Sequence, residues 1–128
     1  NACIWNANQP APLLTDSVTT LGEGLERIVR AKIASCTASP CTVLDQTGSW
    51  IDSFTRSNTG NYTMNIAAGT FSDTPTCVCN GYRASSLGAG CLIDGQSSTR
   101  VDVEITRLDT GALANTTDDL NIICMGPR

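Results

Sequence analysis

The sequence contains no histidine and a single lysine, Lys32. Without histidine, the Ser-His-Asp and Cys-His mechanisms of hydrolysis are excluded. Seven arginines are spread singly along a chain of net charge −4, so no basic stripe could neutralise the phosphates of a nucleic acid. No apolar run approaches the roughly 20 residues that a membrane-spanning helix needs. We therefore expect no nucleic-acid partner and no membrane insertion.

Adjacent carboxylates are also scarce. Asp118 and Asp119 form the only such pair, in the polar stretch "ANTTDDLN", where solvated turn-forming residues are the simpler interpretation. The sequence has neither a G-x-S-x-G motif nor a glycine-rich phosphate loop. We predict that the chain is not an enzyme and holds no cofactor and no metal. An envelope-polysaccharide hydrolase that uses these two aspartates is the least favoured alternative.

Cysteine, by contrast, is abundant, with seven in 128 residues. Together with many Thr, Ser, Asn and Gly residues, this content is typical of secreted or surface β-proteins, whose oxidising surroundings let thiols pair. Cys36 and Cys41 flank "TASP", a turn-forming tetrapeptide that can bring their Cα atoms within disulfide range. We predict that these two cysteines are bonded to each other.

Cys77 and Cys79 lie two residues apart in "TCVCN", so in a strand they point to the same face. They cannot pair with each other there, but each can meet a cysteine of a neighbouring strand. The available partners are Cys91, Cys124 and Cys3. A zinc site is disfavoured, because C-x-C on a strand lacks the C-x₂-C knuckle and no histidine is present. Since seven is odd, at least one cysteine stays free or bonds another chain, and Cys3 is the natural candidate.

Short segments of alternating polarity predict the fold. The first, "LGEGLERIVRAKIAS", is ambiguous: Leu21, Leu25, Ile28 and Val29 fit one face of a helix, while "RIVRAKIAS" also alternates. Two glycines in its first turn favour a short helical or coiled start that passes into a strand. Alternation is clearest in "VDVEI", residues 101–105, whose apolar side chains point one way and whose acidic side chains point the other.

Seven further strands are predicted, separated by turn-forming clusters: residues 41–46, 49–56, 61–67, 75–83, 90–94, 99–107 and 120–125. About eight short strands predict an all-β fold, an antiparallel β-sandwich or jelly roll, over residues 26–128. Residues 1–20 have two prolines and no sustained period, which predicts an extended lead-in. Trp50 and Tyr62 are expected in the core.

Several polar and aromatic residues lie at or beside the predicted turns. They combine guanidinium, amide, carboxylate and phenol groups, which suit stacking on a sugar and hydrogen bonding to its hydroxyls. Ordinary solvent-exposed surface is the alternative interpretation. The candidate ligand-binding residues are Arg56, Asn58, Tyr82, Arg83 and Asp109.

Three longer strings add a resemblance: "GSWI" at 48–51, "AGTFSDTPTC" at 68–77 and "NIICMGPR" at 121–128. In combination they resemble the C-terminal head domain of phage tail-fibre-like proteins. The similarity is strongest to the mosaic adhesive trimers of predatory bdellovibrio-type bacteria. The loops of such heads vary, so no binding residue of the family transfers to a position here.

The resemblance implies a homotrimeric knob at the tip of a surface fibre, with residues 1–25 as the stalk-to-tip junction. Its expected partner is an envelope glycan of prey or host, of the lipopolysaccharide or peptidoglycan type, met outside the cell or in the prey periplasm. We predict that the trimer interface includes Leu21, Leu25, Ile28 and Val29, because a monomer would expose this apolar stripe. A structural fibre cap without a ligand is the alternative.

Overall fold

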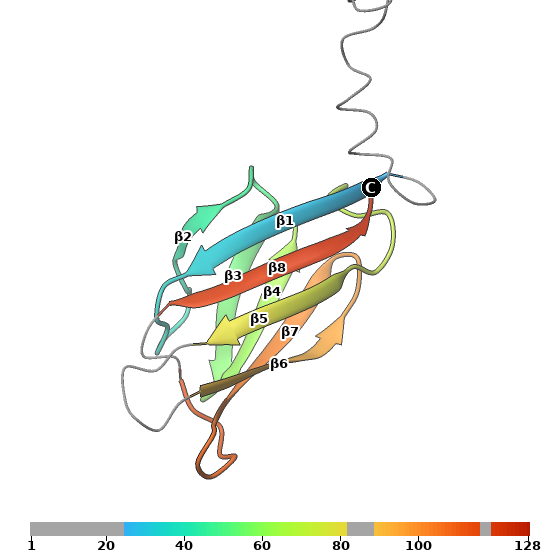
Figure 1. Cartoon of the computed structure of the whole chain (residues 1–128). Helices are drawn as coiled ribbons and strands as arrows, with labels where there is room; N and C mark the ends of the chain where they lie inside the picture. The colour runs from blue at the N-terminus through green and yellow to red at the C-terminus, as the bar shows by residue number, and fades with distance from the viewer. Residues whose placement is uncertain (1–24, 82–88, 116–118) are drawn as a thin grey trace, which may run out of the picture.

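The chain folds into two packed β-sheets (Figure 1). The computed structural model describes residues 25–81, 89–115 and 119–128. Sheet A has the strand order β2-β1-β8-β5 and sheet B has the order β3-β4-β7-β6, with every neighbouring pair antiparallel. The strands are β1 (Glu26–Ile33), β2 (Val43–Gln46), β3 (Ile51–Asn58), β4 (Asn61–Ile66), β5 (Thr76–Gly81), β6 (Ala89–Gln96), β7 (Arg100–Arg107) and β8 (Leu120–Pro127).

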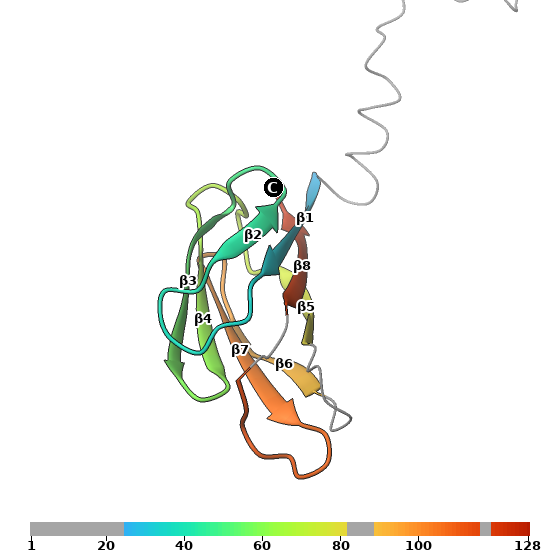
Figure 2. The same cartoon turned by 90° about the vertical axis from the view of Figure 1, so that its left-hand side faces the viewer.

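Figure 2 shows the sandwich from its side, with the strands of the two sheets on either side of the core. The predicted antiparallel β-sandwich of about eight strands is confirmed for the described residues. Three connections, β1 to β2, β3 to β4 and β6 to β7, join neighbours within one sheet, and the others cross between the sheets. The strand order does not by itself establish a jelly roll.

Alternation along the strands decides which side chains form the core. In β7, Val101, Val103 and Ile105 point inward and are at most 2% exposed. Asp102 and Glu104 lie between them on the outer face, as the sequence predicted. The strands therefore form where one face can be buried against the other sheet while the other face stays in water.

The two aromatic residues expected in the core are both buried. Trp50 and Tyr62 are 3% and 2% exposed. The ring of Tyr62 packs against Phe54 with the centroids 5.8 Å apart. Its hydroxyl donates a hydrogen bond to the carbonyl oxygen of Cys36 at 2.9 Å, which satisfies its polar group inside the core.

Three disulfides join six of the cysteines. Cys36–Cys41 closes the β1–β2 connection across the turn, which is the pairing that the sequence predicts. The two same-face cysteines of β5 bond different partners: Cys77 bonds Cys124, directly opposite on β8, and Cys79 bonds Cys91 on β6 of the other sheet. These four cysteines are therefore not thiolate ligands for zinc. Such bonds indicate an oxidising environment, extracellular or periplasmic. Cys3 lies outside the described residues.

The first strand corrects the expected helical stripe. Residues 26–33 are a strand, so the adjacent residues Ile28 and Val29 point to opposite faces of sheet A. Val29 is 4% exposed and belongs to the core, whereas Ile28 is 64% exposed on the outer face. The two side chains cannot share one apolar surface. Leu21 lies outside the described residues, and Leu25 is exposed just before β1.

Strands β1 and β8 pair along their whole length, from Glu26 opposite Pro127 to Ile33 opposite Leu120. The carbonyl oxygen of Leu25 accepts a hydrogen bond from the backbone N–H of Arg128 at 2.9 Å. The start of β1 and the last described residue thus lie together at one end of the sandwich (Figure 1). Among the described residues, no helix is long and apolar enough to cross a bilayer.

Candidate functional site

The predicted ligand residues that the structure describes, Arg56, Asn58 and Asp109, lie at the end of the sandwich opposite to the start of β1 (Figure 1). Arg56 is near the tip of the β3–β4 hairpin, and its guanidinium donates to Asn115 Oδ1 at 2.8 Å and to the hydroxyl of Thr59 at 3.1 Å. Asn115 Oδ1 also accepts from the backbone N–H of Gly60 at 3.2 Å. Arg56 therefore ties the hairpin to the β7–β8 connection.

The other predicted ligand residues at this end also have internal partners where they are described. Asn58 Oδ1 accepts a hydrogen bond from the side-chain amide of Asn61. Asp109 forms an ion pair with Arg107 at 2.6 Å, and this bond holds the pKa of the Asp109 carboxyl below its usual range. Tyr82 and Arg83 lie outside the described residues. Arg56, Asn58 and Asp109 are therefore each engaged by another side chain of the protein.

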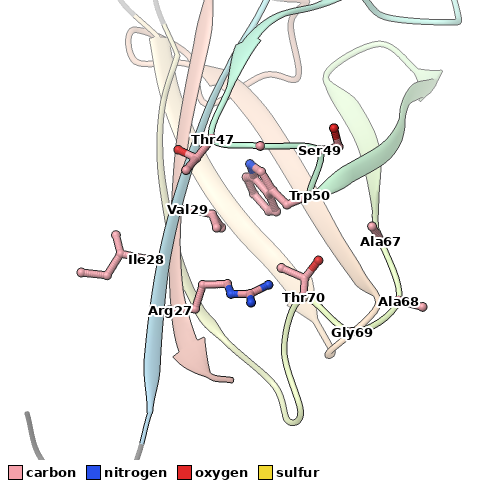
Figure 3. A pocket seen from close by; sticks show the side chains of 11 residues that line it. Arg27, Ile28, Val29, Thr47, Ser49, Trp50, Ala67, Ala68, Gly69 and Thr70 are labelled. Atoms are coloured by element: carbon pink, nitrogen blue, oxygen red, sulfur yellow. The ribbon is translucent and has the colours of Figure 1, made fainter. Parts of the chain in front are cut away.

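A different hollow lies at the end where β1 begins (Figure 3). It is an open pocket of about 440 Å³, within the roughly 300–1,000 Å³ typical of small-molecule sites. Three separate parts of the chain form it: the first half of β1, the β2–β3 turn and the β4–β5 connection. We call it the β1 pocket; it is lined by Arg27, Ile28, Val29, Thr47, Gly48, Ser49, Trp50, Ala67, Ala68, Gly69 and Thr70.

The β1 pocket exists because strand β2 is short. It has four residues and pairs with β1 only at Ala31, Lys32 and Ile33. Beyond it, the backbone of Arg30 is covered by the β2–β3 turn: its carbonyl oxygen accepts from the N–H of Thr47 at 3.0 Å, and its N–H donates to the Thr47 hydroxyl. Residues of β1 before Arg30 have no neighbour on this side among the described residues. The edge of sheet A is left open there.

Trp50 forms the inner wall of the pocket. Its indole N–H donates to the carbonyl oxygen of Arg30 at 3.0 Å. Since the side chain is 3% exposed, it does not offer an open ring face for stacking a sugar. Its role is to fix the β2–β3 turn against β1 and so to hold the pocket open.

Two polar side chains of the pocket have no partner among the described residues. Arg27 is half-buried and forms neither an ion pair nor a hydrogen bond with them. Thr70 is 4% exposed, and no described residue hydrogen-bonds its hydroxyl. Figure 3 shows the Arg27 side chain extending across the pocket towards Thr70, whereas Ile28 points away on the other side of β1. These groups can bind a small polar ligand.

The neighbouring cation, Arg30, differs from Arg27. It pairs with Asp45 of β2, and the bond to Arg30 lowers the pKa of the Asp45 carboxyl. On the far sheet, Arg100 pairs with Asp102 at 2.8 Å beside a smaller hollow of about 290 Å³. Both of these arginines are neutralised within the protein. Among the described arginines that line a hollow, Arg27 stands out as half-buried and unpaired.

A second surface feature lies on the outer face of sheet A. Ile28 is opposite Met125, and Val78 is opposite Ile123, so four exposed apolar side chains are contiguous across β1, β8 and β5. We call these four residues the sheet A patch. Strands β5 and β8 contain no charged residue at all. Contiguous exposed apolar side chains of this kind mark interaction surfaces in soluble proteins.

Other chemistry finds less support in the structure. Asp119 is 3.7 Å from Lys32, as an ion pair at the surface, and Asp118 lies outside the described residues. Among the described residues, no group of three or more His, Cys, Asp or Glu side chains is placed to hold a metal ion.

No protein-family model, curated protein or solved structure matches this chain. The sequence did not predict the β1 pocket, because its lining comes from segments about 20 residues apart that only the fold brings together. The one signal in the sequence was Arg27, which stands where the alternation of the strand would place an apolar side chain facing the core.

Proposed function

We propose that this chain is the head of a homotrimeric surface fibre, which binds saccharides of the cell envelope of prey or host through the β1 pocket. The observation that favours it is the pocket itself, which is open and small and combines apolar walls with one cation and several hydroxyls. Saccharides present rings of hydroxyl groups, for which such donors and acceptors are suitable partners. The three disulfides fit a fibre tip exposed outside the cell.

Trimerisation is part of the proposal and is supported by the sheet A patch. Burying one isoleucine or methionine side chain contributes about 1.5–3 kcal/mol, so three copies that cover these side chains would associate. A patch on one face of sheet A, beside Leu25, would hold the three chains parallel. Three tethered sites can raise avidity by a factor of about 10²–10⁴ without a new contact, which compensates for a weak single site.

The experiment places a bulky side chain in the pocket. Ala68 is exposed at the rim of the β1 pocket, so Ala68→Trp should fill it without disturbing the core. The matched control is Ala112→Trp, which changes an exposed alanine at the opposite end. Retention on immobilised Gram-negative envelope polysaccharide should fall sharply for the first variant and persist for the second.

The opposite pattern would move the site to the end that holds Arg56, Asn58 and Asp109, where the sequence predicted it. If the unaltered protein binds no envelope fraction, the proposed function is wrong, and a fibre cap without a ligand explains the sheet A patch better. Release of reducing ends from the polysaccharide would assign the chain to the hydrolases instead.

A further inference from the structure

The β1 pocket contains features that a neutral sugar would not need. Building on the proposed function, we infer that its ligand is an acidic saccharide, whose carboxylate binds between the Arg27 guanidinium and the open edge of β1. The sugar class is that of uronic acids and related carboxylated sugars. Three independent properties of the pocket lead to this inference: an unpaired cation, an unused backbone donor and a buried hydroxyl.

The first property is the charge of Arg27. A guanidinium is always protonated, and withdrawing part of it from water costs free energy that an oppositely charged partner offsets. Arg27 has no carboxylate partner among the described residues, although the chain carries a net charge of −4. Asp45, which lies opposite Lys32 of β1, is already bound to Arg30. An anionic ligand would supply the missing partner.

The second property is the backbone of Ile28. Both backbone groups of Arg30 face the β2–β3 turn, as their hydrogen bonds to Thr47 show. Backbone groups two residues apart in a strand face the same side, so the N–H and carbonyl of Ile28 also face the pocket. No described residue hydrogen-bonds them, because β2 does not reach this position. The pocket thus has an N–H donor close in sequence to the guanidinium of Arg27.

The third property is the hydroxyl of Thr70. Thr70 is only 4% exposed, yet no described residue hydrogen-bonds its hydroxyl. A buried hydroxyl without a partner costs free energy, and such groups are rare unless a ligand or water pairs with them. In Figure 3 the Arg27 side chain reaches Thr70, whose methyl group faces the guanidinium while its hydroxyl points to the other side. A hydroxyl of the same sugar that extends past the carboxylate can pair with the Thr70 hydroxyl.

These groups select among anions. A carboxylate carries one charge and is planar, so it matches the fork of one guanidinium together with one backbone N–H. A phosphate monoester carries nearly two charges, and the pocket lining offers a single cation for it. A peptide added along the edge of sheet A would find only the short open stretch before Arg30. The observations therefore favour a carboxylated sugar.

The test compares one polysaccharide in two chemical forms, using the full chain. The probes are a uronic-acid-rich envelope polysaccharide and the same material after reduction of its carboxyl groups to alcohols. We expect the protein to bind the acidic form roughly tenfold or more tightly, and Arg27→Gln to abolish this difference, since a charge-assisted bond is lost. Arg100→Gln removes the same charge from sheet B and should leave the difference unchanged.

Two further measurements sharpen the result. Thr70→Val, which keeps the shape of the side chain, should weaken binding several-fold while the thermal midpoint does not fall, because no protein hydrogen bond is removed. Sodium galacturonate should compete with the polysaccharide, and galactose should not. Competition by galactose 6-phosphate at lower concentration, or by a peptide where galacturonate fails, would overturn the inference.

The outcomes separate this inference from the proposed function. Equal binding of the acidic and reduced polysaccharides, sensitive to Ala68→Trp, overturns the acidic ligand and leaves a saccharide site standing. A preference for the acidic form that survives Arg27→Gln overturns the assignment to this pocket. Binding of neither form overturns both.

Discussion

The two outer faces of the sandwich differ in chemistry although the strands that build them alternate in the same way. On sheet A, the middle of the outer face is apolar and strands β5 and β8 contain no charge. On sheet B, strands β6 and β7 present Asp94, Arg100, Asp102 and Glu104. Alternation requires only that the inner face be apolar, so the outer residues are free to serve other purposes. The difference supports the proposal that a partner copy covers sheet A while sheet B stays in water.

The faces also differ in what holds their strands together. A disulfide joins β5 to β8 inside sheet A, and a second ties β5 to β6. In sheet B, outward side chains form polar links instead, such as Thr63 to Asp102 at 3.0 Å and Asn65 to Ser53 at 2.8 Å. The Cys77–Cys124 bond lies in the core, whereas the polar links of sheet B lie on its outer face.

The largest expected effect is on assembly. Ile123→Lys puts a charge in the centre of the sheet A patch, where Ile123 is 46% exposed, and should convert the proposed trimer to monomers because an unpaired charge cannot be buried cheaply. Leu92→Lys is the matched control, since Leu92 is an exposed apolar residue on sheet B opposite Glu104. Sedimentation at micromolar concentration measures both.

If the unaltered chain sediments as a monomer, the sheet A patch does not mediate self-association. If Leu92→Lys dissociates the assembly and Ile123→Lys does not, the roles of the two faces are reversed. Circular dichroism of both variants should match that of the unaltered protein, because neither side chain is part of the core.

The second effect, on stability, compares two disulfides. Cys77 and Cys124 are 47 residues apart in sequence, and Cys36 and Cys41 are 5 apart. In the chain-entropy model, replacing the first pair by alanine costs about 4 kcal/mol of unfolding free energy and replacing the second about 2 kcal/mol. Denaturant titration of the two double variants should show this order. Equal losses would contradict the order that the chain-entropy model gives for the two cross-links.

The smallest effect concerns pH and two exposed aspartates, Asp45 at the edge of sheet A and Asp109 beyond β7. Ion pairing lowers the pKa of each carboxyl from the ordinary value of 3.8, chiefly through hydrogen bonds from Arg30 and Arg107. Each pair therefore contributes stability above the unfolded pKa, and this contribution is lost as pH falls through the lower folded pKa.

Thermal midpoints at pH 7 and pH 2.5 should thus differ slightly less in Asp45→Asn and Asp109→Asn than in the unaltered protein. The change should be small because exposed pairs are well screened by solvent. A larger change in Asp109→Asn than in Asp45→Asn would show that the end of sheet B depends more on its ion pair than the edge of sheet A does. A steeper loss of stability on acidification in either variant would contradict the predicted direction of this effect.

The inner faces could be predicted from the sequence, and the outer surfaces could not. The alternation in "VDVEI" predicted strand β7. Tyr62 was expected in the core because it alternates with Met64 and Ile66. The start of β1 was misjudged because Leu25, Ile28 and Val29 also fit a helix. Local spacing leaves that choice open, and the pairing of β1 with β8 along its full length decides it.

The candidate site was harder to predict for a physical reason. The β1 pocket depends on where β2 ends relative to β1. A sequence pattern does not fix the end of a strand to within a few residues. Arg56 looked available in the sequence, yet Asn115, 59 residues further along the chain, binds its guanidinium. The sheet A patch did leave a signal: in "NIICM" the adjacent Ile122 and Ile123 cannot both face the core.

The position of the β1 pocket has a mechanical consequence. Arg27 and Ile28 lie two and three residues after Leu25, where the preceding chain joins the sandwich. A pull along that chain, resisted by a ligand in the pocket, would load only the first residues of β1. These residues are hydrogen-bonded to β8 on their other side. The hydrophobic core would lie outside the line of tension. A head tethered in this way could hold its ligand under flow or cell movement without being stretched open.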